Sequence, residues 1–176
     1  MKSLFAAATM ALFLAAPAVA LEIEGVKLDD RAKVGPAELQ LNGAGLRTRI
    51  GFKVYAAGLY LTDKTKDPGA AMSAAGPKRV AIHMTRDVGA RTFLDALNEG
   101  IVKNTPAPEL EKLKPQLDEM SATMLAVGDV KKGDVILLDF IPGTGTQITV
   151  NGQPRGKPIA GDNFYRALLG IWLGDK

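Results

Sequence analysis

The stretch from Leu41 to Leu61, LNGAGLRTRIGFKVYAAGLYL, decides how the rest of this chain can fold. It opens with Gly-Ala-Gly, which we interpret as a turn, because Gly43 and Gly45 supply the freedom for a sharp reversal or a β-bulge. From Thr48 onward β-branched and aromatic residues are frequent, which favours strand structure. We therefore expect a pair of strands or one curved strand here, with a bend or a close backbone approach at Gly58.

Arg47 is the unusual residue of this stretch, because it places a cation at the mouth of a long apolar segment. A structural ion pair would explain it, and so would a site for an anionic ligand. The residues alone leave both interpretations open.

Residues 1–20, MKSLFAAATMALFLAAPAVA, have the pattern of a secretory signal. Lys2 is followed by an apolar run, which ends at an Ala-Val-Ala cleavage site. The run is too short for a comfortable membrane span, and no later segment reaches the required ~20 apolar residues. We predict a cleaved signal peptide, one mature domain over residues 21–176, and a bacterial periplasmic location.

Composition excludes several classes of function. The chain has no cysteine and a single histidine, which argues against zinc sites and cysteine nucleophiles. The formal net charge of +3 is spread along the sequence rather than gathered in a basic stripe, so nucleic-acid binding is not expected. Neither a phosphate loop, nor a dinucleotide fingerprint, nor a serine nucleophile elbow is present. We predict no metal and no other cofactor.

The order of elements along the chain indicates an α+β fold with an antiparallel sheet and helices packed on one face. Helices are expected over residues 68–75, 90–104, 108–126 and 164–173, and Pro115 is predicted to kink or break the third of them. Strands are expected over residues 21–28, 37–41, 78–85, 135–141, 146–150 and 153–159, in addition to the opening stretch. In the strand 78–85, Val80, Ile82 and Met84 share one face and His83 points to the other.

Seven polar residues remain as candidates for a site: Arg47, Tyr55, Tyr60, Arg86, Arg91, Asn98 and Tyr165. Core packing explains a tyrosine in a strand, and a solvated loop or helix start explains Arg86 and Arg91. Arg47 is the least easily explained in this way.

Three segments together resemble the chalcone isomerase fold family, and more narrowly its secreted bacterial members. They are L-N-G-A-G-L-R, F-K-V-Y-A-A-G-L-Y-L and the closing G-D-N-F-Y-R-A-L-L-G-I-W-L-G-D, and the likeness covers nearly the whole mature chain. The resemblance implies an open-faced β-sandwich, in which a large antiparallel sheet and a layer of helices enclose a cleft.

The resemblance also implies roles for single residues. In the plant enzymes an arginine after Gly-Ala-Gly binds the substrate phenolate, and Arg47 matches it. Tyr55 takes the place of a threonine of those enzymes. Aligning their helical asparagine with Asn98 puts Arg91 and Leu94 where they carry a tyrosine and a lysine, so the catalytic set is incomplete. Arg47, Tyr55, Arg91 and Asn98 are the predicted ligand-binding residues.

Non-catalytic plant members of the fold resemble fatty-acid carriers, in which the retained arginine pairs with a carboxylate. Our leading hypothesis is therefore a periplasmic binding protein for a fatty acid or a similar apolar anion, held by Arg47. The alternative is an intramolecular lyase that closes a chalcone-like phenol onto a double bond, with Arg47 stabilising the phenolate. A third possibility is an interaction module whose cleft is filled by side chains.

Overall fold

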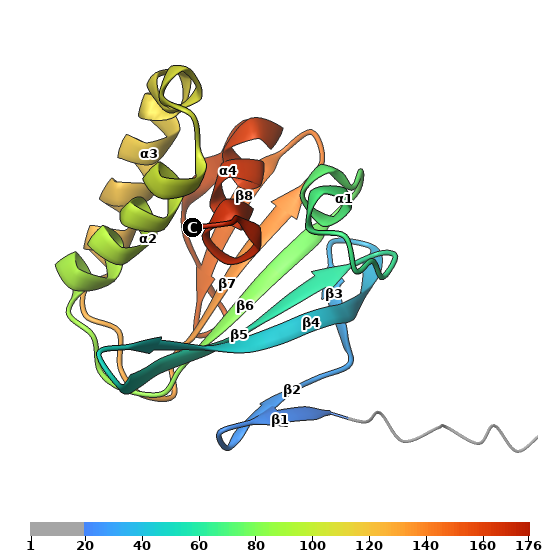
Figure 1. The fold of residues 1–176 in the computed structure, drawn as a ribbon, viewed down its shortest axis with the longest axis vertical. Helices are drawn as coiled ribbons and strands as arrows, with labels where there is room; N and C mark the ends of the chain where they lie inside the picture. The colour runs from blue at the N-terminus through green and yellow to red at the C-terminus, as the bar shows by residue number, and fades with distance from the viewer. Residues whose placement is uncertain (1–19) are drawn as a thin grey trace, which may run out of the picture.

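The structure, a computed structural model, describes residues 20–176. The predicted signal peptide lies outside this range except for its last residue. The centre of the molecule is a curled seven-stranded antiparallel sheet in the order β3-β4-β5-β6-β7-β8-β9 (Figure 1). The strands are β1 Leu21–Ile23, β2 Val26–Leu28, β3 Arg31–Val34, β4 Ala37–Arg49, β5 Phe52–Leu61, β6 Lys78–Met84, β7 Val135–Ile141, β8 Gly145–Val150 and β9 Gln153–Ile159. The helices are α1 Pro68–Ser73, α2 Ala90–Asn104, α3 Ala107–Val127 and α4 Asp162–Leu173.

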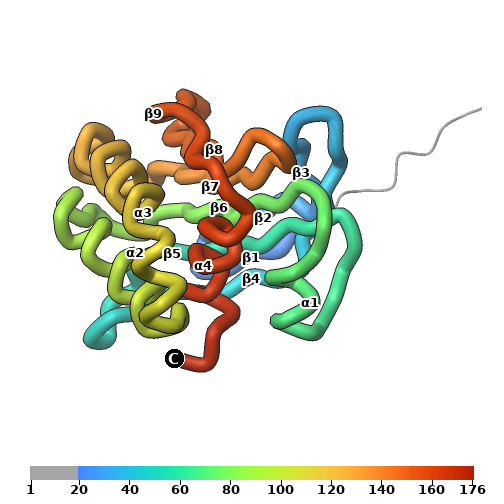
Figure 2. The backbone as a smooth tube through the Cα atoms, turned by 90° about the horizontal axis from the view of Figure 1, so that it is seen from above, coloured from blue at the N-terminus to red at the C-terminus, as the bar shows by residue number. Residues whose placement is uncertain are grey.

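The sheet has a different cover on each face. The helices lie over one face, with α2 and α3 beside each other and α4 against the centre of the sheet (Figures 1 and 2). The short hairpin of β1 and β2 lies on the opposite side (Figure 1). Each face has its own hydrophobic cluster, a large one under the helices and a small one that includes Leu28, Leu39 and Tyr60. The predicted α+β architecture is confirmed.

Strand β6 shows how the sequence pattern assigns these faces. Val80, Ile82 and Met84 belong to the cluster under the helices, whereas Ala81 belongs to the small cluster. His83 shares the side of Ala81 because successive side chains point to opposite faces. The alternation predicted for this strand is therefore confirmed.

Helix α3 differs from the expectation. It runs from Ala107 to Val127 without interruption, although Pro115 lies inside it, so the predicted division into two helices is wrong. Pro115 is exposed, and the carbonyl of Glu111 that loses its helical partner lies on an exposed residue, where water can satisfy it. Packing of Leu113 and Met120 into the core holds the helix on both sides of the proline.

The opening stretch also differs from the expectation. The Gly-Ala-Gly group is not a turn: β4 passes through it, and the chain reverses later, at Ile50 and Gly51. Gly43 and Gly45 do not have the positive φ that tight turns require. The alternative use expected for these glycines, a β-bulge, is present between Leu41 and Gly43. Strand β3 was not predicted, because its four residues, RAKV, are too few to show a periodic pattern.

Candidate functional site

The bulge in β4 decides which side chains reach the helix-covered face. Leu41 belongs to the small cluster, on the face away from the helices. Asn42 is the extra residue, and Gly43 lies opposite Leu59, whose side chain faces the helices. The Asn42 side chain accepts a hydrogen bond of 2.7 Å from the backbone N–H of Thr65, which holds the bulge in place.

Beyond the bulge, Gly43, Gly45 and Arg47 follow each other along the helix-covered face of β4. A Cβ atom at either glycine would meet no other atom within 4 Å, so both positions leave open space. This space is a first cavity of about 380 Å³ between β4, β5 and the C-terminal half of α4. Apolar side chains, among them Leu59 and Leu169, line much of the remaining wall.

A second cavity of about 440 Å³ lies between the end of the β4–β5 hairpin, the loop after β6 and the N-terminal half of α2. Its apolar wall includes Phe52, Phe93 and Leu97. Arg49 and Arg86 add positive charge to this wall. Arg47 and Tyr55 line both cavities, so they stand at the junction between the two.

Tyr55 is held in a defined orientation. Only 5% of its surface is exposed, and its ring meets Phe93 edge-on at a centroid distance of 6.5 Å. Trp172 on α4 donates a hydrogen bond of 3.1 Å from Nε1 to the Tyr55 hydroxyl oxygen. Burial raises the pKa of Tyr55, while this hydrogen bond and the charge of Arg47 oppose the rise. The hydroxyl therefore stays protonated near neutral pH, and its hydrogen is free to be donated.

Arg47 pairs with Tyr55 in the register of β4 and β5, so the two side chains are neighbours on one face. Among residues 20–176 no carboxylate forms an ion pair with Arg47. The structural ion pair that the sequence left open is thus absent from this described part of the chain. A free guanidinium next to a neutral hydroxyl offers several donors to one anionic oxygen pair, and it suits a carboxylate or a phenolate.

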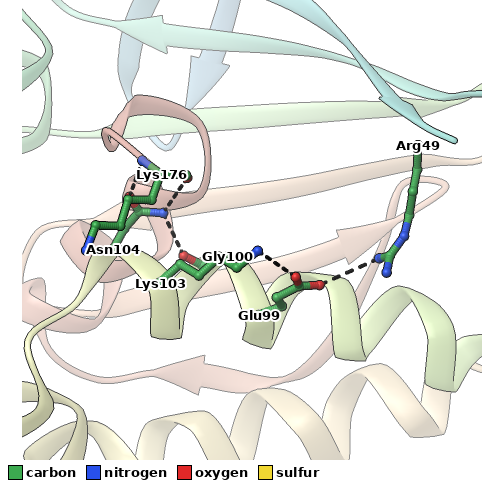
Figure 3. Close-up of polar contacts among 6 residues, drawn as sticks. All are labelled: Arg49, Glu99, Gly100, Lys103, Asn104 and Lys176. Atoms are coloured by element: carbon green, nitrogen blue, oxygen red, sulfur yellow. Dashed lines mark hydrogen bonds and ion pairs between the residues drawn. The ribbon is translucent and has the colours of Figure 1, made fainter. Parts of the chain in front are cut away.

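Polar contacts at two points tie α2 to the rest of the molecule. The Glu99 carboxylate lies 3.7 Å from the guanidinium of Arg49 at the end of β4. It also forms an ion pair with Lys103, one turn later in α2 (Figure 3). Asn104 exchanges two hydrogen bonds of 3.1 Å with the backbone of Lys176 at the C-terminus (Figure 3). These contacts fix the helix that forms one wall of the second cavity.

The other candidates lie away from this junction. Arg91 is exposed in the first turn of α2, and Asn98 is half-buried further along it; neither lines the two cavities. The side-chain oxygen of Asn98 has no hydrogen-bond partner among the described residues. Tyr60 lies in the small cluster on the opposite face, and Tyr165 is buried and donates its hydroxyl to the carbonyl of Leu138 at 2.9 Å. Both of these tyrosines have structural roles.

Sequence reasoning missed the contribution of Trp172 to the site. It is the only tryptophan of the chain, but 117 positions separate it from Tyr55, and no periodic pattern connects residues that far apart. For Arg86, the sequence favours a position in a solvated loop. Its loop lies against the hairpin, where the guanidinium stacks over the ring of Phe52 at 4.9 Å.

The described residues thus form an antiparallel sheet covered by helices on one face, with cavities between the two layers. The family model described as chalcone isomerase-like matches residues 20–176, and the chain belongs to this family. The resemblance to the chalcone isomerase fold family that the sequence motifs indicated is thereby confirmed.

Among solved structures, the chain is similar to the crystal structure of a fatty-acid binding protein from Arabidopsis thaliana. The TM-score is 0.67 at 16% sequence identity, and the match covers 89% of this chain and 90% of the other. At this identity the likeness establishes the fold. No curated protein sequence matches the chain.

Proposed function

We propose that this protein is a non-catalytic carrier that binds a fatty acid or a similar apolar anion. Its carboxylate would lie between Arg47 and Tyr55, and its chain would occupy the first cavity. The observation that carries the proposal is the position of Arg47 and Tyr55 at the end of a cavity whose floor contains two glycines. Within residues 20–176 the guanidinium has no ion-pair partner, and the tyrosine hydroxyl accepts a hydrogen bond but donates none. The fatty-acid binding named for the similar plant structure supports it.

The binding energy can be estimated from this arrangement. Arginine meets a carboxylate through two parallel hydrogen bonds, and such charge-assisted bonds contribute about 1.5–3 kcal/mol each. Each methylene group transferred from water to the cavity adds roughly 0.8 kcal/mol. Affinity should therefore rise with chain length until the cavity is full, and the carboxylate should set the orientation of the ligand.

The environment of α2 supports binding rather than cyclisation. Leu94, at the position of the lysine of the plant enzymes, is buried in the core with 2% exposure. Arg91, at the position of their tyrosine, lines neither cavity. Arg47 and Tyr55 could stabilise a phenolate, but the aligned positions of α2 add no further group to them.

The predicted signal peptide supports a location in the periplasm of a bacterium. Within residues 20–176, no helix has the length and apolar character needed to cross a bilayer. We propose that the mature domain carries its ligand between sites in the envelope.

The proposal is tested by calorimetric titration of the mature domain with laurate and with dodecanol, which has the same chain length without the carboxylate. Arg47→Gln should weaken laurate binding by about 10- to 100-fold, corresponding to the net loss of about one charge-assisted hydrogen bond, because the glutamine amide can still donate to the carboxylate. Dodecanol binding should change little. The matched control is Arg91→Gln, which removes an arginine that lines neither cavity and should leave both affinities unchanged.

Two results would contradict the proposal. One is an Arg47→Gln domain that binds laurate as well as the wild type does. The other is a loss of chalcone absorbance that is faster with the protein than in buffer, which would favour the lyase. If instead Arg91→Gln weakens laurate binding, the carboxylate lies nearer to α2 than we propose.

A further inference from the structure

The turn between β4 and β5 exposes the two most accessible large hydrophobic side chains of the described residues. Ile50 is 88% exposed and Phe52 is 60% exposed, with only Gly51 between them. We call residues 47–53, RTRIGFK, the hairpin tip. A pair of apolar side chains at the end of a projecting hairpin lowers solubility unless something covers it.

Local backbone chemistry does not explain Ile50. Three two-residue hairpin turns of this chain have nearly the same geometry, with φ of 52° and 77° at Glu24-Gly25, 50° and 75° at Ile50-Gly51, and 51° and 77° at Asn151-Gly152. Asparagine is the preferred first residue of such a turn, and a β-branched residue with positive φ is strained. Because Ile50 is also almost fully exposed, packing does not compensate for the strain. The folded monomer alone therefore does not explain why an apolar side chain occupies this position.

The surroundings of Ile50 are cationic. The hairpin tip contains Arg47, Arg49 and Lys53 and no acidic residue. Arg86 adds a fourth positive charge by stacking over Phe52 at 4.9 Å, and its neighbour Asp87 interacts with Lys131 at 3.6 Å.

Two of these cations have acidic partners. Glu99 lies 3.7 Å from Arg49 (Figure 3), and Glu24 binds Lys53; all four side chains remain about half-exposed. Arg47 and Arg86 have no ion-pair partner among residues 20–176. The tip thus combines two exposed apolar side chains with an excess of positive charge.

The tip is also continuous with the candidate site. Ile50, Phe52 and Arg86 line the second cavity, and Arg47 and Tyr55 connect that cavity to the first. A surface that covers the tip would therefore lie at one end of the path to Arg47.

We propose that the hairpin tip docks onto an anionic lipid surface. Ile50 and Phe52 would enter the outermost apolar layer, and the arginines would contact lipid phosphates. Apolar side chains flanked by arginine and lysine are the combination that binds the interface of negatively charged bilayers. This docking goes beyond ligand binding, because it depends on the tip and not on what fills the cavities.

The test is flotation of the mature domain with vesicles. One set contains phosphatidylcholine alone, and the other contains equal parts of phosphatidylcholine and phosphatidylglycerol. The wild type should float with the mixed vesicles, less so with the neutral ones, and added salt should release it. Ile50→Asn should reduce binding to the mixed vesicles on the order of tenfold or more.

The variant is chosen so that folding is not in doubt. Asn151 occupies the same position in an equivalent turn of this chain, so Ile50→Asn should melt at the same temperature as the wild type or higher. The matched control is Val102→Asn, which removes another exposed apolar side chain, 55% accessible, from the last turn of α2. Valine and asparagine have similar helix propensities, and this variant should float like the wild type.

Several outcomes would overturn the docking proposal. They are no flotation of the wild type, equal flotation of Ile50→Asn, or an equal loss in Val102→Asn. A wild-type dimer that Ile50→Asn converts to a monomer, without vesicle binding, would identify a second copy of the chain as the occupant of the tip. Ile50 does not line the first cavity, in which we place the acyl chain, so titration of Ile50→Asn with laurate in the absence of vesicles should match the wild type. Failure of docking is therefore distinguishable from failure of ligand binding.

Discussion

The substitution Gly45→Val tests the first cavity without relying on a charged group. Gly45 has an extended backbone, and a Cβ atom placed there would meet nothing within 4 Å, so valine can be accommodated without strain. Its three carbons would occupy space in the floor of the cavity, opposite Ala57. If they displace about three methylene groups of a bound chain, the loss is about 2.4 kcal/mol, or roughly 50-fold in affinity.

The same substitution should stabilise the ligand-free protein. Glycine inside a strand is destabilising by about 0.5–1 kcal/mol, and valine is among the residues that strands favour. We therefore expect the midpoint of thermal unfolding to rise while the affinity for laurate falls. A folding defect would move both quantities downward, so the two measurements together separate a blocked cavity from a damaged fold.

The measurements are calorimetric titration with laurate and thermal unfolding followed by circular dichroism. Thr48→Val is the control, because it adds a valine to the same strand at an exposed position that lines neither cavity. It should leave the affinity unchanged. If Gly45→Val binds laurate as the wild type does, the acyl chain does not lie in the first cavity and the reasoning is refuted.

Two further substitutions probe the supports of the fold and the site. Tyr55→Phe leaves the indole N–H of Trp172 without its acceptor and removes a donor to the ligand, so both the unfolding free energy and the free energy of laurate binding should fall by about 1 kcal/mol. Arg79→Ala removes the two hydrogen bonds of 2.6 Å that hold the carboxylate of Asp139 on the neighbouring strand. Because that carboxylate is largely buried, urea unfolding should show a loss of about 3 kcal/mol.

Each of these has its own comparison. The control for Arg79→Ala is Arg31→Ala, which breaks the exposed ion pair with Glu38 and should leave the urea midpoint unchanged. Equal effects of the two would show that burial does not govern the strength of these pairs. For Tyr55→Phe, unchanged laurate affinity would remove the hydroxyl from the proposed anion site and leave Arg47 as its only donor.

Much of the architecture could be predicted from the sequence because it depends on local rules. The stripe of Phe93, Leu97 and Ile101 predicted α2, and alternation along β6 assigned its two faces correctly. Helix α3 was predicted with a kink or a break at Pro115, but it is one helix, because packing of the core holds it on both sides of the proline. Arg47 could be singled out because its charge contrasts with the apolar residues that follow it.

The orientation of Arg47 was decided only by tertiary structure. Leu39, Leu41, Gly43, Gly45 and Arg47 alternate with period two, and an uninterrupted strand would place all five on one face. The bulge at residue 42 divides them, so the leucines pack under the sheet while the glycines and the arginine face the helices. Alternation is a property of regular pairing with a neighbour, whereas the bulge depends on β5 and on the distant backbone of residue 65. The sequence by itself determined that a glycine-flanked cation precedes an apolar strand. The pairing of β4 with β5 decided that this cation, although exposed, lines the cavities on the helix-covered face and does not lie on the other face.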